Sequence, residues 1–181
     1  SRGLGDVYKR QGVLRESGIY AKGKRNGTFT EYYQDGVTPR KETPMQQGKI
    51  DGTVKTYFRN GKIEAEKEYK QSVESGRERR FDSKTGEQIF ESHYIDGKKD
   101  GEEWEIFEDA STLRSRIIRH YRNGKLDGSY RVESTRDGKP YITIEGQYTD
   151  GEKSGQWIEH NYDNNTQTCT WHGDCLLYTS D

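Results

Sequence analysis

Two histidines at matching places in the chain are the first residues that could bind a metal ion. His93 and His120 each stand directly before a tyrosine, and imidazole is a common zinc ligand. If both occupy equivalent strands of a sheet of hairpins, two strand spacings, about 9.6 Å, separate them. A zinc–nitrogen bond is only about 2 Å long. We therefore predict no metal site at these residues.

Cys169 is a candidate nucleophile because Trp171 and His172 follow it closely. A catalytic cysteine needs a base, and the base needs a third group that orients it. The sequence offers no such group at a recognisable spacing. Acidic pairs such as Glu102 and Glu103 recur along the chain, and none stands out as an acid–base couple. We therefore expect no catalytic residue and no enzyme activity.

Glycine-rich segments could in principle hold a phosphate group or a calcium ion. Residues 151–155, GEKSG, place Lys-Ser beside glycines, but without the spacing of a phosphate-binding loop. Residues 96–101, DGKKDG, share Asp and Gly with calcium loops, but lack their spacing and their terminal glutamate. Turn chemistry explains both segments, so the sequence predicts no cofactor.

These segments are copies of one seven-residue motif, so a tandem repeat organises the chain. Six copies follow one another at steps of 24 to 27 residues. The copies are AKGKRNG (21–27), QQGKIDG (46–52), KQSVESG (70–76), IDGKKDG (95–101), RNGKLDG (122–128) and TDGEKSG (149–155).

Two positions of the repeat are predicted to be structural: a tyrosine just ahead of the motif and the glycine that closes it. Met45 takes the tyrosine position in the second copy. Burying an aromatic ring contributes several kcal/mol before the entropy cost, so we expect the tyrosines to form a ladder of stacked rings. These positions are Tyr20, Tyr69, Tyr94, Tyr121, Tyr148, Gly27, Gly52, Gly76, Gly101, Gly128 and Gly155.

Strand-forming runs alternate with turn signals throughout the repeat. An aromatic-rich run follows each closing glycine, and most runs end at a second signal such as Asn60-Gly61. Asn-Gly between such runs predicts a type I′ hairpin turn with positive φ at both residues. Each repeat then comprises a strand, a tight turn, a returning strand and a glycine loop. The best rival is a helical turn within residues 108–121.

The outgoing strands do not alternate cleanly. Phe29 and Tyr32 are three residues apart, as are Val54 and Tyr57. This spacing predicts either a β-bulge or aromatic residues on both faces of the sheet. The two alternatives remain open at this point.

The pattern Tyr-x-x-Gly-Lys-x-x-Gly, an aromatic run and then Asp/Asn-Gly resembles the bacterial variant of the MORN repeat, as in YwqK-type antitoxin-like proteins. The resemblance covers residues 12–174, with a degenerate copy at residues 72–86 that lacks the first glycine. It implies an all-β fold of tandem β-hairpins in one extended, twisted antiparallel sheet. It also implies a role in tethering or in contact with other proteins.

The two ends of the chain resemble translated sequencing adapters. Residues 1–11, SRGLGDVYKRQ, match one reading frame of a transposase-based library adapter. Residues 175–181, CLLYTSD, match the complementary strand running into the partner adapter. We therefore expect residues 12–174 to be the native repeat array, as a metagenomic fragment of a longer bacterial gene, and both end segments to be non-native.

Charge and cysteine content exclude some partners. The chain has 30 basic and 31 acidic residues, of which 27 and 29 remain when the two end segments are set aside. A chain of nearly balanced charge lacks the basic excess of nucleic-acid-binding proteins. Cys169 is the single cysteine of residues 12–174, so no disulfide is expected within them.

The sequence predicts a non-enzymatic repeat scaffold that mediates protein–protein interaction. Tryptophan and arginine are enriched at binding hot spots, so Trp104, Trp157, Arg77, Arg79 and Arg80 are the candidate partner contacts. Two alternatives stay open: attachment to the cell envelope through glycans or lipid headgroups, and a repeat appendage of an enzyme domain encoded elsewhere in the gene. The compartment stays open between the cytoplasm and the bacterial cell envelope.

Overall fold

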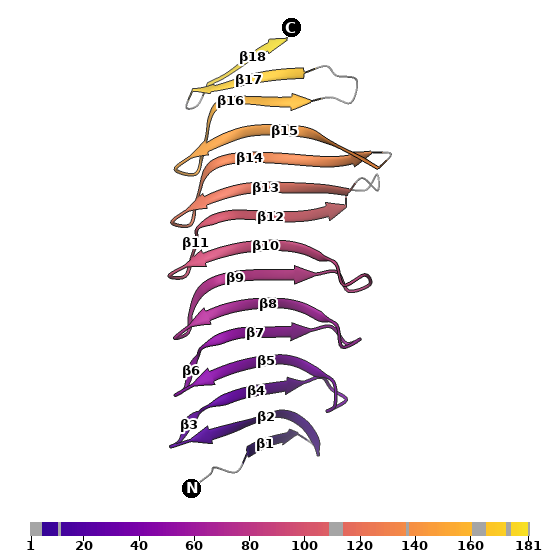
Figure 1. The fold of residues 1–181 in the computed structure, drawn as a ribbon, viewed down its shortest axis with the longest axis vertical. Helices are drawn as coiled ribbons and strands as arrows, with labels where there is room; N and C mark the ends of the chain where they lie inside the picture. Colours follow the sequence, from indigo (N-terminus) through magenta and orange to yellow (C-terminus); the bar gives the residue numbers. More distant parts are fainter. Residues whose placement is uncertain are drawn as a thin grey trace. The chain divides into compact units, whose positions relative to one another are not determined.

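A computed structural model describes the backbone of residues 5–10, 12–108, 114–136, 138–160, 166–172 and 175–180, and the side chains of residues 12–108, 114–135 and 138–160. All the regular secondary structure in these ranges is β-strand (Figure 1). The predicted all-β fold of tandem antiparallel hairpins is confirmed. Among the described residues there is no helix with the length and apolarity needed to span a bilayer.

The chain divides into two compact units, residues 1–89 with 94–97, and residues 90–93 with 98–181. In each unit, strands that follow one another along the chain pair in antiparallel fashion. Unit 1 contains β1 (Gly5–Arg10), β2 (Val13–Ala21), β3 (Lys24–Arg25), β4 (Gly27–Tyr32), β5 (Pro39–Gln46), β6 (Lys49–Ile50), β7 (Gly52–Tyr57), β8 (Ile63–Lys70) and β9 (Val73–Phe81).

The strand β10 (Gln88–Ile95) contributes residues to both units. Unit 2 continues with β11 (Lys98–Lys99), β12 (Gly101–Glu108), β13 (Arg114–Arg122), β14 (Lys125–Arg136), β15 (Lys139–Thr149), β16 (Glu152–His160), β17 (Thr166–His172) and β18 (Cys175–Ser180).

The tight hairpin turns lie at the start of the seven-residue motif. Ala21 pairs with Lys24, so the loop between them holds two residues, Lys22 and Gly23, with φ of 52° and 73°. Two central residues with positive φ define a type I′ turn, whose twist matches the flanking strands. The same pairing and positive φ recur at residues 47–48, 71–72, 123–124 and 150–151. The sequence pattern predicts a glycine loop at these positions, and that prediction is wrong.

The predicted type I′ turn at Asn60-Gly61 is wrong, although the predicted positive φ of Gly61, 80°, is confirmed. Gly61 N–H donates to the carbonyl of Phe58 at 2.9 Å, and Phe58 N–H donates to Lys62 at 2.9 Å. Asn60 lacks the positive φ that a type I′ turn requires. The loop therefore holds three residues, in the arrangement of a type I turn followed by one left-handed glycine. The comparable signal at Asn164-Asn165 lies outside the described residues.

Hydrogen bonds join each tight turn to the preceding repeat of its unit. The carboxylate Oδ2 of Asp100 accepts from the backbone N–H of Asn123 at 3.0 Å, and Gly124 N–H donates to the carbonyl of Lys99. In unit 1, Ser72 N–H donates likewise to the carbonyl of Ile50 at 2.7 Å. The Asp-Gly at the end of the motif thus anchors the next turn instead of forming a turn itself. Neighbouring repeats are coupled directly, as in other repeat proteins.

At β4, both predicted explanations for the irregular alternation are correct: the strand has a β-bulge, and aromatic residues lie on both faces of the sheet. The pairing of β4 with β5 shifts register between Glu31 and Tyr32, which is a bulge. Phe29 is 2% exposed, whereas the Tyr32 hydroxyl lies 3.1 Å from Ser17 Oγ. Ser17 pairs with Thr30, whose side chain points to the face opposite Phe29. Aromatic residues therefore occupy both faces as well.

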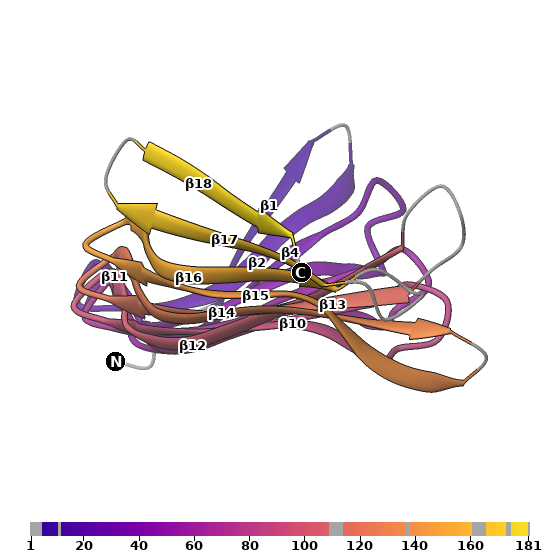
Figure 2. The same cartoon turned by 90° about the horizontal axis from the view of Figure 1, so that it is seen from above.

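The rival helix within residues 108–121 is wrong for its described part. Arg114–Arg122 forms β13, which pairs with β12 on one side and β14 on the other. Residues 109–113 lie outside the described residues. The next hairpin, β14–β15, has the longest strands of unit 2, and its far end bends away from the neighbouring strands (Figure 2).

Candidate binding surface

The buried residues of each unit all lie on one face of its sheet, which we call the buried face. The strand pairings place these side chains on a common side, because alternate residues of a strand point the same way. The opposite side is the open face. The buried residues are Phe29, Thr43 and Val54 in unit 1, and Phe90, Ser92, Glu103, Ser115, Val132, Ser134 and Trp157 in unit 2.

In one repeat of each unit, an aromatic side chain fills the space above a glycine: Trp157 lies over Gly146, and Phe29 lies over Gly18. Trp157 is 5% exposed and meets Tyr148 edge-on, with ring centroids 5.2 Å apart. Lys153 Nζ lies 4.3 Å from the centroid of the indole ring. In unit 1, Phe29 meets Tyr20 in the same way at 5.3 Å. Trp157 therefore supports the fold of unit 2.

Among the described side chains, the regularly spaced tyrosines contact different partners in different repeats, unlike the predicted ladder of stacked rings. The tyrosine contacts with Phe29 and Trp157 are edge-on. Tyr94 instead donates its hydroxyl to Glu78 Oε2 at 3.0 Å and lies under Lys67 Nζ at 4.4 Å. Burial and the neighbouring Glu78 raise the pKa of Tyr94 to about 12. The tyrosines thus pack against rings in some repeats and against charges in others.

Glu103 is the most buried charged residue of the described side chains, with 0% exposure. Its Oε1 accepts a hydrogen bond from Nε of Arg119 at 2.6 Å, and its Oε2 forms an ion pair with Lys99. Burial alone raises the pKa of Glu103, but hydrogen bonds from Lys99, Ser92 and Arg119 outweigh burial and hold it below the usual value. Both oxygens of the Glu103 carboxylate are ion-paired, one with Arg119 and the other with Lys99. Glu103 is therefore a structural group rather than a general base.

The open faces carry large aromatic residues as well. Trp104 is half-buried, and the guanidinium of Arg116 lies 4.5 Å from its ring centroid. In unit 1, the Tyr57 hydroxyl donates to Glu42 Oε2 at 2.7 Å. Burial and that hydrogen bond raise the pKa of Tyr57 to about 12, so its hydroxyl stays protonated.

The three arginines that the sequence groups together do not form one patch. Arg79 pairs across the sheet with Glu66, and their side chains form an ion pair at 3.0 Å. Arg80 follows Arg79 in the same strand and therefore points to the opposite face. Arg77 is exposed. The predicted basic cluster is thus divided between the two faces.

His93 and His120 lie on the two strands that flank Glu102 in unit 2. His120 Nδ1 lies 2.9 Å from Ser129 Oγ, and its Nε2 lies 3.7 Å from Glu102 Oε2. Over the residues that the structure describes, no three His, Cys, Asp or Glu side chains gather as metal ligands do. Cys169 lies in β17, where the side chains are outside the description.

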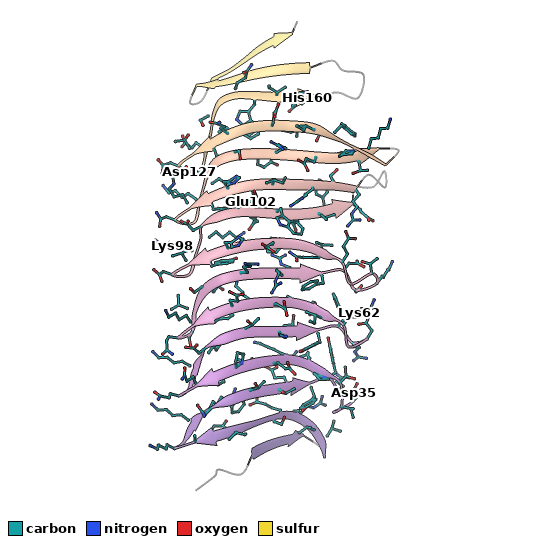
Figure 3. The ribbon with its side chains drawn as sticks, in the orientation of Figure 1. Asp35, Lys62, Lys98, Glu102, Asp127 and His160 are labelled. Carbon is teal, nitrogen blue, oxygen red and sulfur yellow. The ribbon has the colours of Figure 1, made fainter. Side chains whose placement is uncertain are left out.

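Charged side chains mark the two ends of the strands within each unit. In unit 2, Lys98 and Asp127 lie at the end that carries the tight turns (Figure 3). In unit 1, Asp35 and Lys62 lie at the end that carries the longer loops (Figure 3). Asp35 Oδ1 accepts backbone hydrogen bonds from residues 37 and 38, each at 2.9 Å. Hydrogen bonds from Thr38 and Val37 lower the pKa of Asp35 to about 2.

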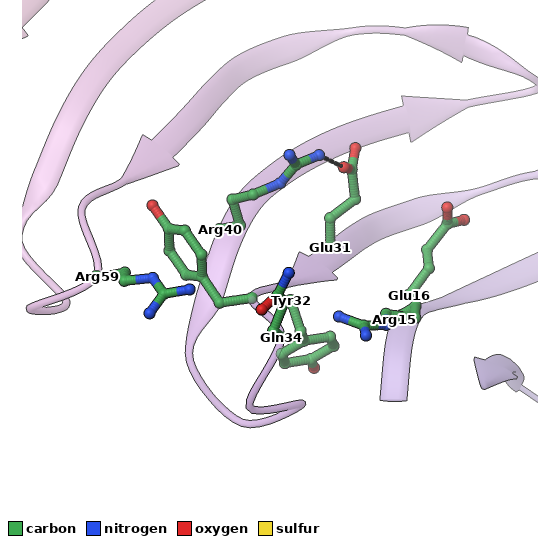
Figure 4. Close-up of a pocket in the computed structure, with 8 residues that line it drawn as sticks. Arg15, Glu16, Glu31, Tyr32, Gln34, Arg40 and Arg59 are labelled. Atoms are coloured by element: carbon green, nitrogen blue, oxygen red, sulfur yellow. Dashed lines mark hydrogen bonds and ion pairs between the residues drawn. The ribbon is translucent and has the colours of Figure 1, made fainter. Parts of the chain in front are cut away.

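A hollow of about 480 Å³ opens among these longer loops of unit 1 (Figure 4). Its walls come from β2, β4, β5 and the loops that follow β4 and β7. Six of its lining residues carry polar side chains with hydrogen-bond donors: Arg15, Arg40, Arg59, Tyr32, Tyr33 and Gln34.

Sequence reasoning missed Glu103 and the arginines of the hollow. Glu103 follows its closing glycine by two residues, the position held by Phe29, Val54 and Trp157 in other repeats. Comparing repeats position by position would have marked it as a buried charge. Arg15 and Arg59 stand 44 residues apart, and no local signal connects them.

The described residues therefore supply a buried face and an open face in each unit, and a polar hollow in unit 1. No family model matches the chain, and no curated protein matches it.

Proposed function

We propose that the chain is a non-enzymatic repeat scaffold that binds another protein through the open faces of its sheets. The observation that carries this proposal is the half-buried Trp104, layered with Arg116 at 4.5 Å on an open face. Tryptophan, tyrosine and arginine are the side chains most enriched at protein interfaces. Tyr32 and Tyr57 supply the same chemistry on the open face of unit 1.

The charges of the open face in unit 1 are arranged to neutralise one another. Lys55 lies 3.5 Å from Glu66, and Arg79 lies 3.0 Å from the same carboxylate. The whole chain carries a formal net charge of −1. Such a surface gives little long-range attraction for a polyanion, which favours a protein partner over nucleic acid. The resemblance to MORN repeats points in the same direction.

Affinity capture with the full chain tests the proposal. The chain is immobilised and exposed to a bacterial lysate, and retained proteins are identified by mass spectrometry. We expect a protein whose capture falls at least about tenfold for Trp104→Ala, because a hot-spot truncation costs about 2 kcal/mol. Tyr57→Ala probes the open face of unit 1 in the same assay.

The matched control is Val37→Ala, which removes an apolar side chain that is 77% exposed at a loop tip. Its capture should equal that of the unaltered chain. Capture that is equally strong for Trp104→Ala, Tyr57→Ala and Val37→Ala would refute binding through the open faces. Turnover of a small metabolite by the purified chain would refute the non-enzymatic scaffold.

A further inference from the structure

We propose that the hollow of unit 1 binds the carboxylate groups of an acidic peptide segment. This inference rests on the proposed protein-binding function and names the chemistry of one contact. The groups that carry it are Arg15 and Arg59, whose guanidinium groups approach the hollow from opposite sides, with Gln34 between them (Figure 4).

The two carboxylates of the hollow are already neutralised by other arginines. Glu31 Oε2 accepts from Arg40 at 2.5 Å, and Glu16 Oε1 accepts from Arg25 at 2.6 Å. Asp35, close to the hollow, is held by backbone N–H groups of its own loop. Glu16 and Glu31 are therefore engaged by other arginines, whereas Asp35 compensates the charge of Arg59 in part.

The lining holds three arginines, Arg15, Arg40 and Arg59, against the two glutamates Glu16 and Glu31, and therefore carries an excess of one positive charge. Among the described side chains, neither guanidinium forms an ion pair, and the recorded contact of Arg59 is with an aromatic ring. A guanidinium presents its N–H groups as a planar fork that fits the two oxygens of a carboxylate. The hollow thus offers two such forks to an incoming ligand.

The ring of Tyr33 favours one placement of Arg59 before any ligand binds. Its guanidinium carbon lies 5.6 Å from the centroid of the Tyr33 ring, and the Tyr33 hydroxyl donates to the carbonyl of Tyr57 at 2.5 Å. A guanidinium stacked on a ring keeps its N–H edges free for an anion. Preorganisation of this kind lowers the entropy cost of binding.

The arrangement favours a carboxylate ligand over a nucleic acid. The Glu31–Arg40 ion pair in the wall of the hollow shows that an arginine of this lining already holds a glutamate carboxylate. A strand of nucleic acid would need a continuous row of cations along its backbone. Here the excess positive charge of the hollow is local, in a chain whose formal net charge is −1.

Fluorescence anisotropy with a labelled hexaglutamate peptide tests the proposal on the full chain. We expect binding that weakens on raising the salt concentration, because the contact is an exposed charge pair. Arg15→Gln and Arg59→Gln should each weaken binding about tenfold, and the double variant should abolish it. Arg15→Lys, which keeps the charge but loses the fork, should weaken binding less than Arg15→Gln.

Arg122→Gln is the matched control, since Arg122 is an exposed arginine of unit 2 outside the hollow. It should leave the affinity for hexaglutamate unchanged, and hexaglutamine should not bind. Equal affinity of the double variant and the unaltered chain would overturn the proposal. Equal or tighter binding of oligothymidylate through the same arginines would overturn the choice of an acidic peptide. Circular dichroism of each variant confirms that its sheet content is retained.

Hexaglutamate binding by the hollow and protein binding by the open faces can fail separately. If hexaglutamate binds through Arg15 and Arg59 but affinity capture retains no protein through Trp104 or Tyr57, the hollow stands and the open-face scaffold falls. If a captured protein depends on Trp104 but is indifferent to Arg15 and Arg59, the scaffold stands and this inference falls.

Discussion

Gly146 lies directly beneath the indole ring of Trp157, so closely that a Cβ atom on Gly146 would stand 2.3 Å from ring atom Cδ2. Gly18 and Phe29 have the same relationship in unit 1, also at 2.3 Å. These two glycines are required for space, because neither has a positive φ. A small residue in one strand thus makes room for a large ring in its neighbour.

We predict that Gly146→Ala destabilises the chain by about 1 to 3 kcal/mol, the usual cost of overpacking. The added methyl group must displace the indole of Trp157, whose Nε1–H donates to the carbonyl of Gln147 at 3.2 Å. The indole N–H resonance of Trp157 should therefore shift in the NMR spectrum. Gln147→Ala, which truncates an exposed neighbour, is the control; an equal effect of both variants would refute the steric explanation.

The buried ion pairs of Glu103 predict a loss of stability in acid. The folded pKa of Glu103 lies below the usual 4.5, so the stabilisation is fully present above pH 4.5 and is lost as the pH falls through the folded pKa. Glu103→Gln leaves Arg119 and Lys99 without their carboxylate and should cost about 3 kcal/mol at pH 7. Urea unfolding between pH 3 and pH 7 measures both effects.

The matched control for Glu103→Gln is Glu102→Gln, since Glu102 is the exposed neighbour of Glu103 in β12. Exposed ion pairs contribute about 0 to 1 kcal/mol, so the control should be nearly neutral. Glu103→Gln should also flatten the acidic part of the stability profile. A profile that keeps its slope in Glu103→Gln would show that another carboxylate causes the acid sensitivity.

Ser72 adopts a φ of +70° at the turn position that glycine holds in the other copies of the motif. Its hydroxyl accepts a hydrogen bond from Ile50 N–H at 3.0 Å. Ser72→Ala keeps the strained backbone and loses this bond, so it should cost about 1 kcal/mol. Ser72→Gly loses the bond but relieves about 1 kcal/mol of backbone strain, so its stability should be nearly unchanged. Thermal unfolding distinguishes the two; equal destabilisation would contradict the balance of strain and hydrogen bonding.

The adapter-like ends provide another test. β1 pairs with β2, and β18 pairs with β17, but an open sheet edge accepts many strand-like segments. Deleting residues 1–11 and 175–181 should leave the midpoint of thermal unfolding almost unchanged. Deleting residues 152–181 instead, which removes the buried Trp157, should lower it. A collapse of the sheet in the first deletion would show that the end segments belong to the fold.

The fold was accessible from the sequence because its signals are local and repeated. Regular spacing of the tyrosine and glycine positions predicts hairpins, and Asn-Gly predicts the positive φ found at Gly61. The turn type was not accessible, because Asn-Gly suits both a two-residue type I′ loop and the observed three-residue loop. Only the strand register decides between them.

The candidate sites were harder to predict because they depend on pairing between distant residues. Glutamate is seldom fully buried, and Glu103 is buried only because Arg119, 16 residues away, faces it across the strands. The hollow depends on loop ends that bring Arg15 and Arg59 together. Arg79 and Arg80 show the converse, since adjacent residues of a strand point to opposite faces.

The central claim is that the chain is an array of hairpins, each stabilised by its own turn and its immediate neighbours. Gly61 tests it well, because its φ is +80° and a Cβ atom there would meet no other atom within 4 Å. Gly61→Val should therefore cost about 1 to 3 kcal/mol through backbone strain alone. Gly61→Asn should be mild, since asparagine tolerates the left-handed region.

Hydrogen exchange measured peptide by peptide on Gly61→Val and Gly61→Asn is the most direct measurement. We predict that valine lowers protection in β7 and β8, while the hairpins that contain Trp104 and Trp157 keep most of theirs. Asparagine should leave the pattern close to that of the unaltered chain. Equal effects of valine and asparagine would contradict the left-handed turn at Gly61, and a uniform loss of protection along the chain would contradict the modular array.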